Sequence, residues 1–295
     1  MADGIFKVEH PVNEPVLTYA PGTRERDALK KTVSAMRAEE VEVPCIIGGK
    51  EVRTGNLGRM TIPHEHGHLL GTYHKAGPRE TGMAIAAALD AAAEWTALPW
   101  EERLSIFKRA AELLAGPWRM TLNGATLLGQ SKNPFQAEID SACELIDFFR
   151  FNSYYARKIY EDQPISSGVV WNRLEYRPLE GFVFAVTPFN FTSIAGNLPS
   201  APAMLGNVVV WKPASSAVYS AYRLMLLFKA AGVPDGVINF VPGDGAAVGT
   251  PALESPHLAG IHFTGSTAVF KGMWKTIGSN IGSYRAYPRI VGETG

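Results

Sequence analysis

Apolar residues in the second half of the chain occur in short runs that alternate with amphipathic stretches. Runs with the length of buried strands lie at residues 182–186, 208–211, 237–241 and 258–263, and a further one begins at 289–291. A helical pattern separates these runs, as at 217–231, where Gly232 follows in the position typical of a helix end. The alternation predicts right-handed β-α-β units and a parallel sheet covered by helices, so the expected fold class is α/β.

Helical periodicity dominates the first half of the chain, after an N-terminal region that is punctuated by prolines. Apolar positions at helical intervals predict helices within residues 23–40, 83–97, 100–114 and 133–159. Asn133-Pro134 opens the last of these, because proline suits the first position of a helix. Two strand-like segments complete the pattern. One is short, at 45–47 before the turn signal Gly48-Gly49, and the other is an alternating stretch at 169–176.

The overall composition predicts a large apolar core and no unusual charge. Hydrophobic residues make up 46% of the chain and charged residues 19%, and 28 basic residues balance 28 acidic ones. No basic excess is available to attract nucleic acid or an anionic membrane surface. The sequence has no run of about 18 apolar residues, and residues 1–10 resemble neither a signal peptide nor a transit peptide. We therefore expect a cytoplasmic protein with neither nucleic acid nor membrane as a partner.

Two glycine-containing segments follow predicted strands, which is where α/β proteins bind their ligands. The first, GDGAAVG at 243–249, would let the backbone approach a pyrophosphate, although an ordinary turn explains it equally well. The second, FTGST at 263–267, lies between a strand and a helix. Ser266 in this segment is either a plain helix cap or a phosphate donor.

Two polar side chains also follow predicted strands and have both a chemical and an ordinary interpretation. Lys212 lies where a ribose or a phosphate would bind, but most single lysines are surface residues. Asn190 follows Pro188 and is either a turn residue or an amide that donates to a developing oxyanion.

The histidines and cysteines of the chain are candidates for metal binding and for nucleophilic attack, but their surroundings argue against both. His64, His66 and His68 alternate as on one face of a strand, but the flanking turn residues and the lack of a completing ligand argue against a metal, so we predict none. Cys45 lies in an apolar strand and Cys143 on the apolar face of a helix. Neither position offers the cationic neighbour that a reactive thiolate needs, so we expect both to be core residues.

Taken together, these motifs resemble those of the aldehyde dehydrogenase superfamily. The matching segments are TPFNF at 187–191, WKPA at 211–214, AGVPDGVINFVPGDG at 231–245, FTGST at 263–267 and GETG at 292–295. The first half narrows the resemblance to the delta-1-pyrroline-5-carboxylate dehydrogenase (glutamate-semialdehyde dehydrogenase) branch. It does so through NEPVLTYAPGTRERDAL at 13–29, PHEHGHLLGTYHKA at 63–76 and PFQAEIDSACELIDFFRFN at 134–152.

The resemblance implies a domain plan and a role for each candidate residue. Residues 1–160 would be an irregular and helical portion that packs on a Rossmann-like, NAD-binding portion at 161–295. Asn190 would be the oxyanion-hole amide and Glu293 the general base. Phe191 and Glu144 would border the aldehyde pocket. The NAD contacts would come from Pro188, Lys212, Ser215, Gly245, Gly249, Gly265 and Ser266.

The resemblance also implies that part of the machinery is missing. The superfamily's cysteine nucleophile and its catalytic domain would lie beyond residue 295, so we expect this chain alone to be inactive. The complete enzyme would oxidise L-glutamate γ-semialdehyde to L-glutamate with NAD in proline degradation, as a homo-oligomer. The alternatives are a non-catalytic NAD-binding remnant or partner subunit, and a dehydrogenase for another semialdehyde.

Overall fold

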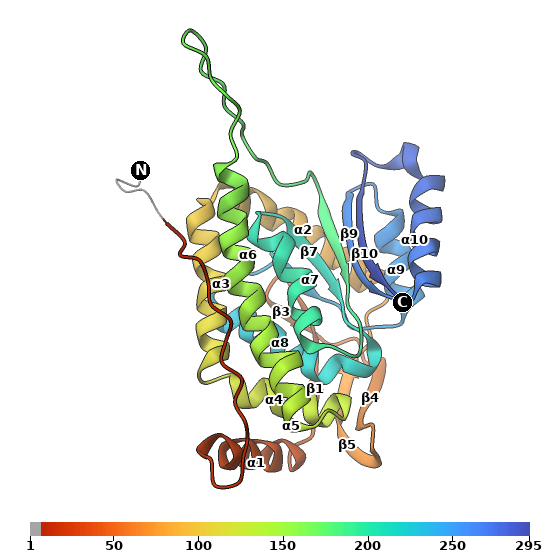
Figure 1. The fold of residues 1–295 in the computed structure, drawn as a ribbon. Coiled ribbons are helices and arrows are strands. Elements are labelled where there is room, and N and C mark those ends of the chain that lie inside the picture. The colour runs from red at the N-terminus through yellow and green to blue at the C-terminus, as the bar shows by residue number, and fades with distance from the viewer. Residues whose placement is uncertain (1–6) are drawn as a thin grey trace.

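A seven-stranded sheet forms the centre of the chain in the computed structural model, which describes residues 7–295 (Figure 1). Its spatial order is β10-β9-β6-β7-β8-β2-β3, and the five strands from β10 to β8 are parallel to one another. The bounds of these five are Phe182–Val186 for β6, Val208–Lys212 for β7, Ile238–Phe240 for β8, Leu258–Gly265 for β9 and Arg289–Thr294 for β10. The prediction of a parallel sheet in an α/β fold is confirmed.

Two strands from the first half of the chain extend the same sheet. Strand β2 (Cys45–Ile47) lies antiparallel to β8, with Ile46 opposite Phe240, and β3 (Lys50–Val52) pairs antiparallel with β2. The turn between them is Gly48-Gly49, and both glycines have positive φ. The predicted division of the chain at residue 160 remains a prediction.

A second, three-stranded sheet carries the histidine-rich segment. Its members are β1 (Val41–Val43), β4 (Leu57–Ile62) and β5 (Glu65–His74), in the order β1-β5-β4. His64 lies in the turn after β4, where its Nδ1 is 2.8 Å from Ser131 Oγ, and His68 Nε2 is 3.0 Å from the carbonyl oxygen of Arg37. Within residues 7–295 no group of three His, Cys, Asp or Glu side chains is placed to hold a metal ion.

Most helices lie at the positions where apolar periodicity predicts them, but the helix at Arg119–Gln130 was not predicted. The helices around the main sheet are α1 (Arg24–Arg37), α2 (Pro78–Ala97), α3 (Trp100–Ala115), α4 (Arg119–Gln130), α7 (Thr192–Met204), α8 (Val218–Ala231), α9 (Gly245–Glu254) and α10 (Thr267–Ser279), with short 3-10 turns at Ser215–Ala217 and Ile281–Ser283. Gly232 ends α8 in the left-handed conformation, with φ of +94°. In the part of the chain that the structure describes, no helix is both long enough and apolar enough to cross a membrane. The interpretation of residues 1–10 falls largely on residues 1–6, which lie outside the described residues.

The predicted helix from residue 133 contains an irregularity that the sequence pattern did not indicate. It begins as α5 (Pro134–Ala137), continues as a π-helical segment (Glu138–Cys143), and becomes regular again as α6 (Glu144–Glu161). Asn133 caps it, because its side chain accepts from Gln136 N at 2.9 Å while the Gln136 side chain accepts from Asn133 N at 3.1 Å. The helix is therefore continuous, but its hydrogen-bond register changes in the middle.

The predicted strand at 169–176 is wrong. The segment between α6 and β6 forms no regular strand and extends away from the body of the molecule, seen as the green trace in Figure 1. It is held by local contacts, such as Asn172 Nδ2 donating to Ile165 O at 2.8 Å. Val169 and Trp171 are 94% and 83% exposed, because no strand lies beside the segment within residues 7–295 to complete a ladder or to bury its apolar side chains.

Candidate functional site

A cleft of about 890 Å³ lies beyond the carboxyl ends of the parallel strands. The ends of β6, β7, β9 and β10 contribute to it, together with the first turns of α9 and α10. Eight of the eleven side chains or glycines selected from the sequence line it, namely Pro188, Asn190, Lys212, Gly245, Gly249, Gly265, Ser266 and Glu293. The topology therefore brings together residues that are more than one hundred positions apart, as a doubly wound sheet does.

One side of the cleft is built from glycines and helix starts. A Cβ added at Gly245 or Gly249 would meet no other atom within 4 Å, so this part of the wall is backbone that faces open space. Ser266 caps α10, since its Oγ accepts from Val269 N at 3.4 Å. Free N–H groups at helix starts and a wall without side chains fit the pyrophosphate of a dinucleotide.

Lys212 is a buried cation at the end of β7. It is 9% exposed, and burial lowers the pKa of its ammonium, although the negative charge of Asp244 partly opposes that shift. In the described range no carboxylate lies within ion-pair distance of Lys212. A desolvated ammonium without a direct ionic partner can donate to ligand hydroxyl or phosphate oxygens at little further cost.

Asn190 and Glu293 line the same cleft as the first turn of α9. Asn190 is exposed in the loop between β6 and α7, and Glu293 is exposed on β10, opposite Thr264 of β9. A carboxamide and a carboxylate that share one cleft can donate a hydrogen bond to a carbonyl oxygen and accept a proton from water.

Three of the selected residues do not line the cleft. Ser215 donates from Oγ to the carbonyl oxygen of Gly243 at 3.1 Å, so it supports the lead-in to α9. Glu144 accepts a hydrogen bond from Ser193 at the start of α7. Phe191 follows Asn190 and has the ammonium of Lys132 4.4 Å from its ring centroid. The roles that the resemblance gives to these three residues stay predictions, as do those of the other eight.

Sequence reasoning missed the apolar wall of the cleft. This wall consists of Phe184, Val186, Phe189, Leu253, Phe263, Val269 and Met273. Phe263 stacks on Phe270 with ring centroids 5.3 Å apart, and a Cβ added at Gly292 would lie 2.5 Å from the Phe270 ring. Gly292 therefore leaves the space that Phe270 occupies. The position of Phe263 at the end of a strand was the available signal.

Both cysteines are buried away from the cleft. Burial raises the pKa of Cys45 to about 12, and the charge of Glu80 adds to the shift. Burial likewise raises the pKa of Cys143 to about 12, with a further contribution from Glu138. The expectation that both are core residues is confirmed, and neither thiol is in a position or an ionisation state to attack a ligand in the cleft.

Comparison with known proteins identifies the class of protein that this fold and cleft define. The aldehyde dehydrogenase family model matches residues 53–288, and the chain belongs to this family. Within the family its similarity is to the delta-1-pyrroline-5-carboxylate dehydrogenases. It is 52% identical over 292 residues to that enzyme from Agaricus bisporus, covering 98% of this chain and 53% of the relative. It is 46% identical to the mitochondrial enzyme of Dictyostelium discoideum, covering 97% of this chain and 52% of the relative.

The solved structures give the same result. The delta-pyrroline-5-carboxylate dehydrogenase from Mycobacterium tuberculosis, determined with bound NAD, superposes with a TM-score of 0.98 at 53% identity, covering all of this chain and 55% of that one. The chain thus spans about half the length of the curated relatives that it matches. Because the Dictyostelium relative is named as mitochondrial, the cytoplasmic location expected from the sequence remains a prediction.

Proposed function

We propose that residues 1–295 form the NAD-binding half of an enzyme that oxidises L-glutamate γ-semialdehyde, derived from delta-1-pyrroline-5-carboxylate, to L-glutamate. The observation that carries the proposal is the cleft, which is lined by glycines and two helix starts together with Asn190 and Glu293. Similarity to delta-1-pyrroline-5-carboxylate dehydrogenases over 98% of the chain supports the substrate. The NAD-bound relative supports the cofactor.

The residues of the cleft fit both cofactor binding and the reaction itself. Gly245, Gly249 and Ser266 would hold the pyrophosphate of NAD, and Lys212 would donate to its adenosine side. When bound, NAD would supply the acceptor for a hydride. Glycine walls of this kind exclude side chains and let the backbone donate directly to phosphate oxygens.

The reacting end of the cleft would use Asn190 and Glu293. The Asn190 amide would donate a hydrogen bond to the aldehyde oxygen while negative charge develops on it. Glu293 would take a proton from the water that releases the product. We propose that the attacking thiolate comes from the half of the relatives' length that this chain does not cover, because Cys45 and Cys143 are buried elsewhere.

The activity is tested in a protein in which residues 1–295 continue into the second half that the relatives possess. We expect steady NADH formation with glutamate semialdehyde.

In the same protein we expect that Asn190→Ala lowers kcat/KM by about 100-fold or more, as loss of an oxyanion donor does. Glu293→Gln should slow turnover while leaving NAD binding intact. Absence of turnover with this substrate, together with turnover of a different semialdehyde, would overturn the substrate assignment.

NAD binding by residues 1–295 should depend on Lys212. Lys212→Met removes a desolvated ammonium whose pKa burial has lowered, so we expect the Kd for NAD to rise about 10-fold or more while the fold is not destabilised. Isothermal titration calorimetry measures the Kd, and thermal unfolding measures the stability. Lys158→Met, at a half-exposed lysine of α6 paired with Glu161, is the control and should alter neither. An unchanged Kd for NAD in Lys212→Met would show that Lys212 does not contribute to cofactor binding.

A further inference from the structure

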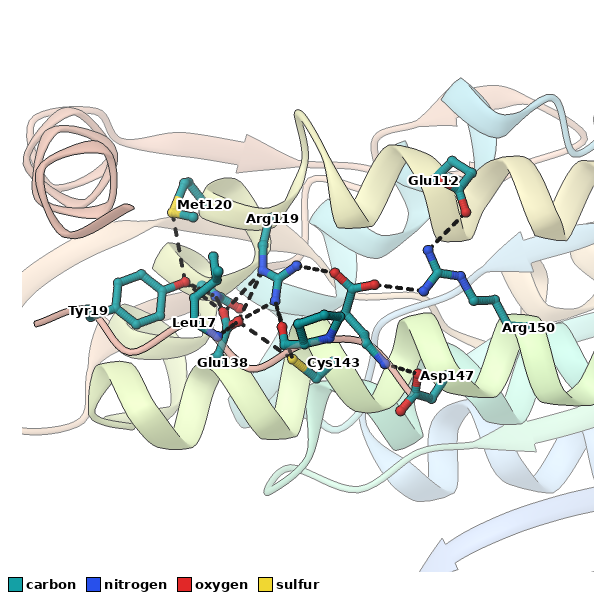
Figure 2. Close-up of polar contacts among 12 residues, drawn as sticks. Leu17, Tyr19, Glu112, Arg119, Met120, Glu138, Cys143, Asp147 and Arg150 are labelled. Carbon is teal, nitrogen blue, oxygen red and sulfur yellow. Dashed lines mark hydrogen bonds and ion pairs between the residues drawn. The ribbon is translucent and has the colours of Figure 1, made fainter. Parts of the chain in front are cut away.

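A buried carboxylate, Glu138, holds together segments from three parts of the chain (Figure 2). It is 0% exposed and accepts from Leu17 N at 2.8 Å, Tyr19 Oη at 2.6 Å and Asn123 Nδ2 at 2.8 Å, besides its ion pair with Arg119. Burial alone would raise the pKa of Glu138, but the guanidinium and the other donors hold it below its usual value. We call Tyr19, Arg119, Asn123 and Glu138 the arm clamp.

The arm clamp continues along the N-terminal arm, residues 13–20. Arg119 also pairs with Glu14 and donates to the carbonyl oxygen of Pro15 at 2.8 Å. Asp147 on α6 accepts from Asn13 Nδ2 at 2.7 Å and from Glu14 N at 2.8 Å. These are contacts between groups more than one hundred residues apart, so the arm is fixed by polar contacts to α4, to the π-helical segment and to α6.

The π-helical segment Glu138–Cys143 begins at the clamped carboxylate. Its wider register is visible at its end, where Glu144 N donates to Ile139 O, five residues earlier. Ser141 Oγ donates to Asn123 Oδ1 at 2.6 Å, so a second side chain of the segment is attached to the arm clamp. A return to α-helical register would turn the residues that follow by roughly 100°, since an α-helix has 3.6 residues per turn.

The same segment is also connected to two residues near the cleft, Phe191 and Glu144. Asp140 forms an ion pair with Lys132, and the ammonium of Lys132 lies 4.4 Å from the centroid of the Phe191 ring. Glu144, directly after the segment, accepts from Ser193 Oγ at the start of α7. We call Phe191 and Glu144 the outer wall: neither lines the cleft, but Phe191 directly follows the cleft residue Asn190, and both are connected to the segment.

We propose that the arm clamp is a positioning device for this wall. By fixing the π-helical register, Tyr19 and Arg119 set where Asp140 and Glu144 point, although neither of them touches the cleft. The description of the wall as the aldehyde side rests on the proposed function, but the positioning itself does not.

The titration of Glu144 reports the geometry of this wall. Burial raises the pKa of Glu144, the carboxylates of Asp140 and Glu293 raise it further, and Ser193 and Lys132 oppose the shift. A change of helical register would move Glu144 relative to all four groups. Carbon-13 NMR of chain labelled at the glutamate side-chain carboxyl measures this pKa without substrate or cofactor, and Glu144→Gln assigns the signal.

Two variants and a control make the test. Glu138→Gln and Tyr19→Phe should each shift the Glu144 titration midpoint back toward the ordinary glutamate value, the first more than the second. Tyr19→Phe removes a hydrogen bond without removing a charge, so a shift of the Glu144 midpoint in this variant arises from a change in geometry. This variant remains informative if Glu138→Gln does not fold. Glu51→Gln breaks an exposed ion pair between Glu51 of β3 and Arg53, outside the arm clamp, and should leave the midpoint unchanged.

The outcomes separate this proposal from the proposed function. A shift in Tyr19→Phe and none in Glu51→Gln supports the positioning role, even in a protein without dehydrogenase activity. An unchanged Glu144 midpoint in Tyr19→Phe, together with faster amide hydrogen exchange in residues 13–20, would overturn it. In that case the arm would have loosened without moving the wall, and the arm clamp would serve stability alone.

Discussion

Residues 1–295 mixed with NAD and glutamate semialdehyde are expected to form NADH no faster than the same mixture without protein. The cleft places an amide and a carboxylate together, but the two cysteines are buried outside it. With a pKa of about 12, neither thiol supplies appreciable thiolate at neutral pH. Loss of a covalent nucleophile typically lowers turnover on the order of 10⁶-fold. Absorbance of NADH at micromolar chain concentration measures the rate.

The control for this result is a protein that also contains the second half of the relatives' length. It should turn over under the same conditions, which shows that substrate and cofactor are competent. Calorimetry of the 295-residue chain with NAD shows in parallel that the cleft is formed. NADH formation that scales with the concentration of the 295-residue chain and disappears in Cys143→Ser would mean that a buried thiol becomes accessible. The assignment of the nucleophile to the part of the relatives' length that this chain does not cover would then be wrong.

The sequence predicted which residues line the cleft where those residues lie at or directly after a strand end. Lys212, Gly265 and Ser266 could be found because each follows an apolar run, and the carboxyl ends of parallel strands meet at one edge of a sheet. Their convergence in one cleft needed only the β-α-β topology. The specific roles came from the resemblance to a family, since GxGxxxG spacing alone does not distinguish a cofactor cradle from a turn.

Features that depend on distant partners could not be predicted in this way. The 169–176 stretch alternates like a strand, but a strand depends on a paired partner, and no strand pairs with it in the described part of the chain. The π-helical segment buries Glu138 and Ser141 while Ile139 is only partly buried, and the apolar pattern gave no signal of the change in hydrogen-bond register. Tyr19 and Glu138 are 119 residues apart in sequence, and no local pattern indicates that they meet.

Replacing Arg119 should cause the largest loss of stability of any single change to the arm clamp. The side chains of Arg119 and Glu138 are 5% and 0% exposed, so Arg119→Met leaves a buried carboxylate without its cation. Breaking one partner of a buried pair costs about 3–5 kcal/mol in the free energy of unfolding. Urea unfolding followed by circular dichroism measures it. Arg53→Met makes the same change in an exposed pair with Glu42 and should have little effect.

The pH dependence of this loss identifies its cause. In the native chain the pKa of Glu138 is held down, so the stability it contributes is present at neutral pH and is lost as the pH falls through the folded-state pKa. In Arg119→Met only hydrogen bonds, such as those from Tyr19 and Leu17 N, still oppose burial, so the pKa of Glu138 rises, and the penalty is largest at neutral pH and shrinks as the carboxyl becomes protonated. The stability difference between the two proteins should therefore narrow from pH 7 toward pH 4.

The double variant Arg119→Met with Glu138→Met should recover much of the loss at neutral pH, because apolar side chains replace both charges. A difference that is constant with pH, and not recovered in the double variant, would show that Arg119 stabilises the arm by packing and by its contacts with Glu14 and Pro15, with no net contribution from the charge of Glu138.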